Sequence, residues 1–306
     1  MARLAIIIPH TGDVSALEDT LASVLANRPD DCEIIVVLAR PYEDPYDVKG
    51  EVEFVTAQPQ GGPVEAMNLG IRRARAPLIH VLRCGVEVEE GWADAAINRL
   101  RDPRVWAVAP LVVESENPAR IVAAGVAYHV GGSVVPLAAG GAADSVGNRC
   151  RRVLAPHPAA AFYRKTTWES LGGFDPGLGD QLAWVDAGLA LERCGLLTVL
   201  EPGCRVRASR RCAAPASAFR QALESEQLFW RWAGRLGRGR SVAAHALMLL
   251  GEAARGMLNL SVAPRTTGRL AGAWLAMRRR APSRPDLRSL SPPPSANGSM
   301  PSSRAA

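Results

Sequence analysis

The chain has 306 residues, of which 48% are hydrophobic and 22% charged, which suits a large globular domain and excludes a disordered or fibrous protein. Its six cysteines are scattered, with no Cys-x-x-Cys pair and no histidine at zinc spacing, which excludes a zinc finger and favours a reduced, cytoplasmic interior. The net charge of +6 is unevenly divided: 15 arginines and 3 glutamates between Cys204 and Arg280 give +12, and the tail adds +2, which leaves −8 for residues 1–203.

This asymmetry predicts an anionic partner for the later segment, with membrane lipid, a lipid phosphate and nucleic acid as the alternatives. Nucleic acid is the least favoured, because the chain lacks a recognition motif. An equally weighted interpretation is that arginine replaces lysine throughout the chain, where only Lys49 and Lys165 occur, and merely solvates the helices.

Apolar runs and amphipathic stretches alternate in the first part of the chain. The run Leu4–Ile8 is too short for a signal peptide and ends at a proline. Because it is continuously apolar, we expect a strand that is buried on both faces. Further strands are predicted at Glu33–Leu38, Val52–Thr56 and Leu78–Leu82, and helices at Ser15–Ala26, Pro63–Arg75 and Glu89–Leu100. The alternation predicts an α/β fold with a mainly parallel sheet, right-handed crossovers and flanking helices.

The later elements are less regular. Apolar runs predict strands at Val105–Val113, Arg120–Tyr128, Leu196–Leu200 and Arg205–Ala208, the last two separated by a turn at Glu201-Pro202-Gly203. Gly131–Gly147 is rich in glycine and alanine and predicts a loop, and Lys165–Leu171 predicts a helix. Three helices are then expected at Ser217–Leu236, Ser241–Leu260 and Thr266–Arg280.

These three helices form a predicted basic extension, residues 213–280, after a first domain of residues 1–212. None is expected to span a bilayer, because Glu252 and Arg255 interrupt the middle one. The third carries Leu270, Trp274 and Met277 among arginines, which suits an interfacial helix at an anionic membrane; the alternative is packing against the first domain. Residues 281–306 are rich in proline and serine and predict a disordered tail.

The stretch Gln60–Trp92 carries the most specific pattern. A Gly-Gly-Pro turn opens a helix that contains Asn68-Leu69-Gly70, and a buried strand then leads into Arg83-Cys84-Gly85, at the strand end where open α/β sheets bind ligands. With Ile7-Ile8-Pro9, Ile35-Val36-Val37 and Gly172-Gly173-Phe174-Asp175, this order resembles the family-2 glycosyltransferases of the Rossmann-like GT-A fold. The resemblance runs from Leu4 to about Val206.

The resemblance implies a nucleotide-diphospho-sugar donor and a glycan or lipid-linked acceptor. The positions that match the family's donor site are Pro9, His10, Thr11, Arg40, Gly61, Gly62, Asn68, Arg83 and Gly85. Those on the acceptor side are Phe174, Asp175 and Trp184. His10 is also consistent with a loop histidine that has no chemical role, and His157 is undecided.

Four positions depart from the family pattern, in which carboxylates bind the nucleotide, hold a metal and act as the base. They are Leu38, Arg83, Gly85 and Trp184. We therefore expect no metal ligands and no cofactor, with the guanidinium groups of Arg83 and Arg40 neutralising phosphate instead. Asp186 is the first candidate for the catalytic base and Asp180 the second.

Two functions follow as hypotheses. The first is a glycosyltransferase of cell-surface polysaccharide synthesis, metal-independent if active, in the cytoplasm or peripheral at the inner membrane face. The alternative is a catalytically inactive relative that binds a glycan or a partner as a scaffold, because a cation in place of a metal-holding carboxylate removes the metal route. The sequence leaves open whether the chain is an enzyme.

Overall fold

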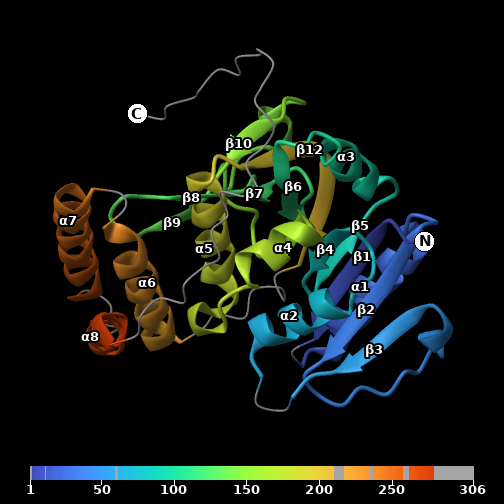
Figure 1. Cartoon of the computed structure of the whole chain (residues 1–306), viewed down its shortest axis with the longest axis horizontal. Coiled ribbons are helices and arrows are strands. Elements are labelled where there is room, and N and C mark those ends of the chain that lie inside the picture. The colour runs from blue at the N-terminus through green and yellow to red at the C-terminus, as the bar shows by residue number, and fades with distance from the viewer. Residues whose placement is uncertain are drawn as a thin grey trace.

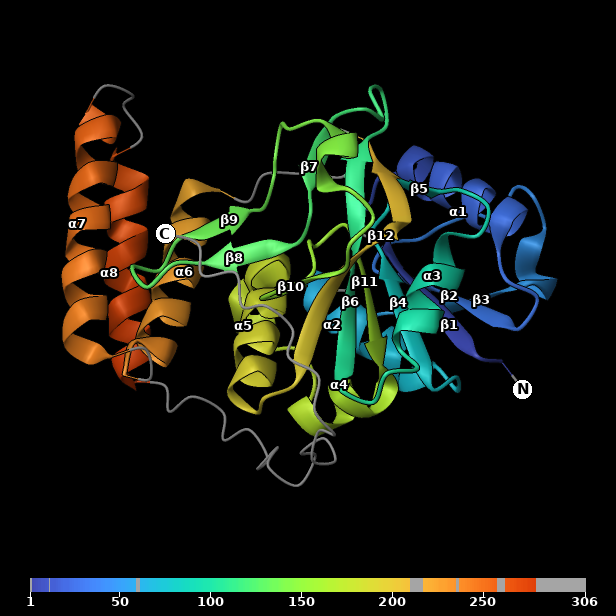
Figure 2. The same ribbon diagram turned by 90° about the horizontal axis from the view of Figure 1, so that it is seen from above.

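The computed structural model describes residues 2–10, 12–58, 61–209, 217–234, 237–257 and 262–278. In this part of the chain a ten-stranded sheet is covered on both faces by helices, and helices α6, α7 and α8 stack at one side (Figures 1 and 2). The predicted disordered tail lies outside the described residues.

The sheet has the strand order β10-β12-β6-β11-β4-β1-β2-β3, with β5 paired to β12 and β7 to β6. Its strands are β1 (Leu4–His10), β2 (Cys32–Leu38), β3 (Val52–Thr56), β4 (Leu78–Leu82), β5 (Val86–Val88), β6 (Val105–Glu114), β7 (Ile121–Ala123), β10 (Arg151–Val153), β11 (Ala160–Arg164) and β12 (Leu197–Ala208). Strands β1 to β4 are parallel to one another, and β6 is parallel to β12, whereas β11 runs antiparallel between β4 and β6. The predicted mainly parallel α/β fold is confirmed.

Helices cover both faces of the sheet, and each face has its own core. Their bounds are α1 (Val14–Asn27), α2 (Pro63–Arg73), α3 (Trp92–Arg99), α4 (Lys165–Leu171), α5 (Gly179–Arg193), α6 (Ala218–Ala233), α7 (Arg238–Met257) and α8 (Val262–Arg278). Along β1, Leu4, Ile6 and Ile8 join the core under α1 and α3, whereas Ala5 and Ile7 join the core under α2 and α5. Because alternate side chains of β1 enter two buried cores, both faces of the strand are apolar and it contains no polar residue before its end.

Two predictions of secondary structure in the middle of the chain are wrong. The stretch expected as one strand, Arg120–Tyr128, breaks at Gly125 (φ +83°), so that β7 joins the main sheet and β8 (Val126–Tyr128) forms a separate hairpin with β9 (Val134–Pro136). Strand β9 and a 3₁₀ turn at Ala143–Val146 lie inside the predicted loop Gly131–Gly147. The short, isolated strands have too few residues for a visible period.

The turn predicted at Glu201-Pro202-Gly203 is also wrong, because β12 runs unbroken from Leu197 to Ala208. Its register against β6 shifts between Glu201 and Arg205, which is the mark of a β-bulge. A bulge absorbs Pro202, whose missing N–H would otherwise interrupt the ladder.

Of the three C-terminal helices, α6 and α8 pack most closely against each other. Gly268 and Gly272 of α8 lie against the backbone of α6, where an added Cβ would overlap Phe219 O and lie 2.5 Å from Leu223 O. The β8–β9 turn contacts α7 through a hydrogen bond from Ser133 Oγ to Met248 Sδ (3.0 Å). No helix in the described ranges combines the length and apolar character needed to cross a bilayer.

Candidate active site

The sequence-predicted residues gather at the carboxyl ends of β1, β2 and β4. His10 ends β1, Arg40 follows β2, and Arg83 follows β4. Because β1 lies between β2 and β4, Arg40 and Arg83 are separated by about two strand spacings, or ~10 Å. Thr11 lies outside the described residues. The site therefore has two separate cations along one sheet edge.

Arg83 is paired with Asp180 in the first turn of α5. The two side chains form an ion pair, and each is 26% exposed. The backbone of Arg83 is fixed by a hydrogen bond from its N–H to Ala159 O (2.9 Å). A partly exposed pair at a strand end keeps both charges accessible to a ligand, which a fully buried pair would not.

His157 lies beside this pair. Burial, together with the nearby charge of Arg83, lowers the pKa of His157 to about 4, so the ring is neutral at neutral pH. The N–H of Ala159 donates to His157 Nδ1 (3.2 Å), which places the ring proton on Nε2. His157 therefore adds a neutral hydrogen-bond donor and no further charge.

His10 is fully buried rather than part of an open loop. Among the described residues, neither of its ring nitrogens has a hydrogen-bond partner, and burial lowers its pKa. Arg40 lies close to Gly12, whose φ of +136° favours glycine, and a Cβ there would lie 3.2 Å from Arg40 Cδ. Gly12 thus allows the guanidinium to approach the β1 end.

Tyr42 and Asp44 are two candidate site residues that sequence reasoning missed. The Tyr42 ring lies edge-on to His10 with centroids 6.3 Å apart. Its hydroxyl and both carboxylate oxygens of Asp44 are buried without a hydrogen-bond partner in the described part of the chain. Buried polar atoms need partners, so this group is suited to a polar ligand such as a nucleobase. The signal in the sequence was the Pro-Tyr-Glu-Asp-Pro-Tyr run directly after Arg40.

Gly61, Gly62, Asn68 and Gly85 have structural contacts. Gly62 is the N-cap of α2, and its N–H donates to Glu65 Oε2 (2.5 Å); Gly61 N–H donates to Gln58 O (2.9 Å). Gly85 is buried, and its N–H donates to Ala16 O and Thr20 Oγ1 of α1. Asn68 donates to Phe174 O (2.8 Å) and accepts from Phe174 N–H and Trp168 Nε1. Their direct role in donor binding stays a prediction.

The residues predicted on the acceptor side lie mostly inside the protein. Trp184 is 2% exposed and packs against Phe174, with ring centroids 4.7 Å apart. Asp175 caps a 3₁₀ turn by accepting from Gly177 N–H (2.9 Å). The two aromatic rings therefore fill the core beneath α5 and present no stacking face.

Asp186, the first candidate for the base, is 0% exposed. Its carboxylate accepts hydrogen bonds from Arg231 Nη1 (3.1 Å) and Trp232 Nε1 (2.8 Å) of α6. A base must reach the proton it removes, and Asp186 instead joins α5 to α6. Of the two predicted bases, Asp180 is the one with solvent access.

The residues at the end of β4 do not fit a divalent metal. Hard cations require several oxygen ligands, whereas this position presents the guanidinium of Arg83, and the Asp180 carboxylate beside it is already paired with that guanidinium. Across the described ranges, no group of three or more His, Cys, Asp or Glu side chains is placed to hold a metal ion.

No family model and no curated protein sequence matches the chain. Among solved structures it is similar to GalNAc-T7 with UDP, GalNAc and Mn²⁺, at TM-score 0.59 and 15% identity over 76% of this chain. The chain spans about half of that protein, 50% of its length. It is also similar to the mannosyltransferase PcManGT from Pyrobaculum calidifontis with GDP-Man and Mn²⁺ (TM-score 0.53, 16% identity, 90% of this chain and 87% of that one).

A third similar structure is the TarS 1-349 fragment of S. aureus in complex with UDP (TM-score 0.56, 12% identity, 84% of this chain and 73% of that one). These likenesses show that the chain has the GT-A fold of nucleotide-diphospho-sugar transferases. Family-2 membership itself stays a prediction.

Proposed function

We propose that the protein is a family-2-type glycosyltransferase that transfers a sugar from a nucleotide-diphospho-sugar to a glycan or lipid-linked acceptor in cell-surface polysaccharide synthesis. The observation that carries this proposal is the accessible Arg83–Asp180 pair at the end of β4, on a fold whose solved examples hold UDP or GDP-Man. The two groups match the two charges of the reaction: the cation can balance the leaving diphosphate, and the carboxylate can accept the proton of the acceptor hydroxyl.

In the proposed reaction, the acceptor hydroxyl oxygen attacks the anomeric carbon and its proton passes to Asp180. The electron pair of the breaking carbon–oxygen bond stays on the departing nucleoside diphosphate, whose added charge Arg83 balances by paired hydrogen bonds. When the diphosphate engages the guanidinium, the Asp180 carboxylate loses that partner and becomes the stronger base. His157 Nε2 supplies a neutral donor at the same place.

We assign the nucleoside of the donor to the side chains of His10, Tyr42 and Asp44, next to the end of β1. His10, Tyr42 and Asp44 offer unpartnered nitrogen and oxygen atoms there, and Arg40 offers a second cation. These side chains lie on the far side of β1 from Arg83, so a nucleoside and its diphosphate would span the sheet edge.

Calorimetry with UDP and GDP, each with and without Mn²⁺, tests the proposal. We expect binding of one nucleotide without metal, and Arg83→Ala should weaken it at least about tenfold, since a charged hydrogen bond contributes ~1.5–3 kcal/mol. Arg152→Ala is the matched control, because Arg152 pairs with Glu192 at the opposite end of α5. Absence of any nucleotide binding would favour the scaffold alternative; a strict need for Mn²⁺ would refute metal independence.

We further propose that helices α6–α8 bind an anionic membrane surface. The three glutamates of this segment are paired with arginines: Glu224 with Arg220, and Glu226 and Glu252 with Arg269. The outer surface of α8 presents Leu270 (73% exposed) and Met277 (80% exposed). Exposed apolar side chains on helices whose sequence is rich in arginine support binding at an anionic interface.

A further inference from the structure

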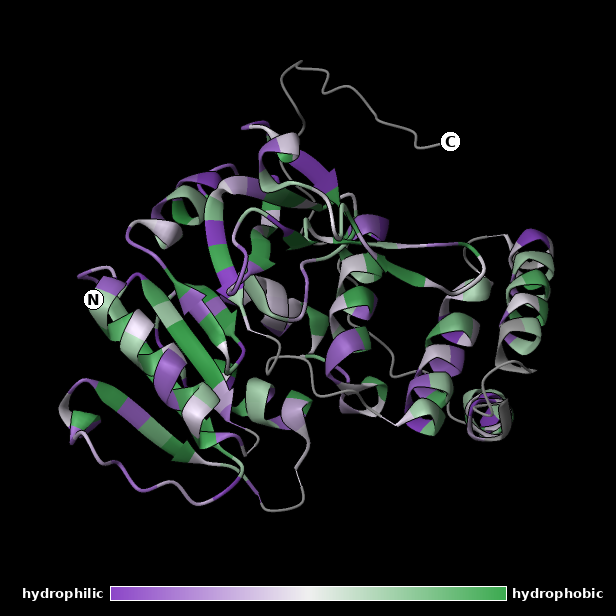
Figure 3. Cartoon of the chain, turned by 180° about the vertical axis from the view of Figure 1, so that it is seen from behind, coloured by the Kyte–Doolittle hydropathy of each residue, from purple (hydrophilic) through white to green (hydrophobic). Residues whose placement is uncertain are grey.

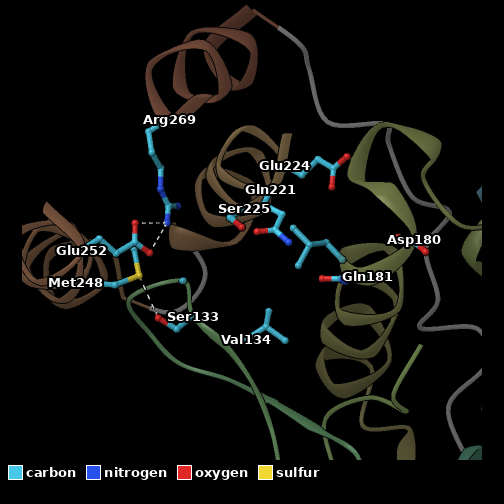
Figure 4. A pocket seen from close by; sticks show the side chains of 12 residues that line it. Ser133, Val134, Asp180, Gln181, Gln221, Glu224, Ser225, Met248, Glu252 and Arg269 are labelled. Atoms are coloured by element: carbon cyan, nitrogen blue, oxygen red, sulfur yellow. Dashed lines mark hydrogen bonds and ion pairs between the residues drawn. The ribbon is translucent and has the colours of Figure 1, made fainter. Parts of the chain in front are cut away.

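A cavity of about 270 Å³ opens between the N-terminus of α5, helices α6 to α8 and the β8–β9 turn (Figure 4). Its volume is just below the ~300–1,000 Å³ range of small-molecule sites, which suits a single small unit. Its polar lining includes Asp180, Gln181, Gln221, Ser225, Glu252 and Arg269. One of them, Asp180, is the carboxylate that pairs with Arg83. The cavity therefore begins where the proposed transfer chemistry takes place.

The charges around this cavity are already neutralised by the protein. Both Glu252 oxygens accept from Arg269 Nη2 (2.9 Å each), and Arg269 Nη1 donates to Glu226 Oε2 (3.2 Å). Glu224 accepts from Arg220 Nε (2.7 Å). A phosphate or carboxylate ligand would have to displace one of these carboxylates from its arginine. The cavity thus disfavours a charged occupant.

Its free polar groups are neutral. The side-chain amides of Gln181 and Gln221 come from α5 and α6 and point toward the cavity, as does the Ser225 hydroxyl (Figure 4). In the described part of the chain these three side chains make no hydrogen bond. An amide both donates and accepts, which matches a hydroxyl group that does the same.

An apolar surface lies beside these groups. Leu182, Val134 and Met248 complete the lining. A sugar ring has hydroxyl groups around its edge and C–H groups on its faces, so it requires neutral hydrogen-bonding groups next to an apolar wall. A purely apolar ligand would leave both amides unpaired, which costs binding energy.

We infer that this cavity is the subsite for a neutral sugar unit of the acceptor. The inference rests on the proposed function, because it uses Asp180 as the group that receives the proton of the hydroxyl held there. It adds the substrate class: an uncharged glycosyl residue, bound by Gln181, Gln221 and Ser225, at the contact between α5 and the C-terminal helices.

Saturation-transfer NMR on the full chain tests this inference with methyl glycosides of glucose, galactose, mannose and N-acetylglucosamine at millimolar concentration. We expect at least one glycoside to give signals in the wild type. The double variant Gln181→Ala/Gln221→Ala should weaken them about tenfold, from the loss of two neutral hydrogen bonds. Ser225→Phe should abolish them by filling the cavity.

Gln227→Ala is the matched control, because Gln227 lies on α6 and does not line the cavity. Nucleotide binding by each variant, measured in parallel, separates this inference from the proposed function. If UDP or GDP binds but no glycoside signal is seen, or if the signals survive both cavity variants, the subsite is refuted while the donor proposal stands. Glycoside binding without nucleotide binding supports the subsite and refutes the donor proposal.

Discussion

At the scale of single residues, two aspartates on one helix have opposite environments. Asp180 and Asp186 lie six residues apart on α5, but Asp180 is in the first turn at the sheet edge, whereas Asp186 is buried beneath α6. The sequence ranked Asp186 first because it aligns with an acidic family position. Burial, which alignment does not report, reverses that order.

Replacing these aspartates should therefore affect different properties. Asp180→Asn should lower the rate of sugar transfer by about 10²–10⁴-fold, the usual contribution of general-base catalysis, with folding unchanged. Transfer to an acceptor, followed by product chromatography, and a thermal melt measure the two effects. Undiminished transfer by Asp180→Asn would exclude it as the base.

Asp186→Asn should instead destabilise the fold. The substitution weakens the charge partner of the half-buried Arg231 and the acceptor of the Trp232 indole, at a cost of about 1–3 kcal/mol. Denaturant titration checks this value. If Asp186→Asn were as stable as the wild type but inactive, Asp186 would again be the favoured candidate for the catalytic base.

At the scale of elements, α6, α7 and α8 are held together by one buried network. Glu226 of α6 accepts from His245 Nε2 of α7 (3.1 Å), from Trp230 Nε1 (2.8 Å) and from Arg269 of α8 (3.2 Å). His245 Nδ1 also lies 2.7 Å from Gly131 O in the β8–β9 turn. Sequence periodicity predicted the three helices, but not this connection between them.

The network should make the helical extension sensitive to acid. Burial raises the pKa of Glu226, but the hydrogen bond from His245 and the charge of Arg269 outweigh it, so the net pKa is lowered. The stabilisation is therefore fully present above the ordinary glutamate pKa of ~4.3 and is lost as pH falls through the lower folded value. Unfolding free energy measured from pH 6 to 3 should fall less steeply for Glu226→Gln than for the wild type. Equal slopes would contradict the role of Glu226.

The contact between α6 and α8 depends on two glycines. Gly272→Val would bring its Cβ to 2.5 Å from Leu223 O, closer than a carbon and an oxygen can pack, and overpacking of this kind costs ~1–3 kcal/mol. Hydrogen exchange should then rise along α8. The control is Gly239→Ala, where a Cβ meets nothing within 4 Å. Unchanged exchange in Gly272→Val would show that α8 is held elsewhere.

At the scale of the whole molecule, the described chain has an α/β end and a helical end that is rich in arginine and exposes apolar side chains. In Figure 3 apolar residues run through the central strands and also along the outer helix α7. Leu247 and Leu250 of α7 are 70% and 67% exposed, and Arg278 lies over the Trp274 ring of α8 at 4.0 Å. Arg269 of α8 pairs with Glu226 and Glu252, so this arginine does not add to the basic surface that the sequence predicted.

The helical end should bind vesicles that contain anionic lipid. Leu270→Ser/Met277→Ser should reduce co-sedimentation with phosphatidylserine vesicles severalfold, because each exposed apolar side chain contributes up to ~1.5–3 kcal/mol when buried. Tyr46→Ser, at an exposed site on the α/β end, is the control. Equal sedimentation of all three proteins, or none with the wild type, would contradict membrane association.

The sequence by itself determined the order and type of most strands and helices. Along β1 to β4 and the helices between them, the spacing of apolar residues reflects which side chains are buried. It also placed Arg83 at a ligand-binding sheet edge, since strand ends in such sheets converge. Only the tertiary structure decided which carboxylate meets Arg83, that His10, Tyr42 and Asp44 share one buried group, and that Gln181 and Gln221 face one cavity. These contacts join segments that are far apart in the sequence. They depend on how the elements pack, and the periodicity of one segment carries no information about its distant partner.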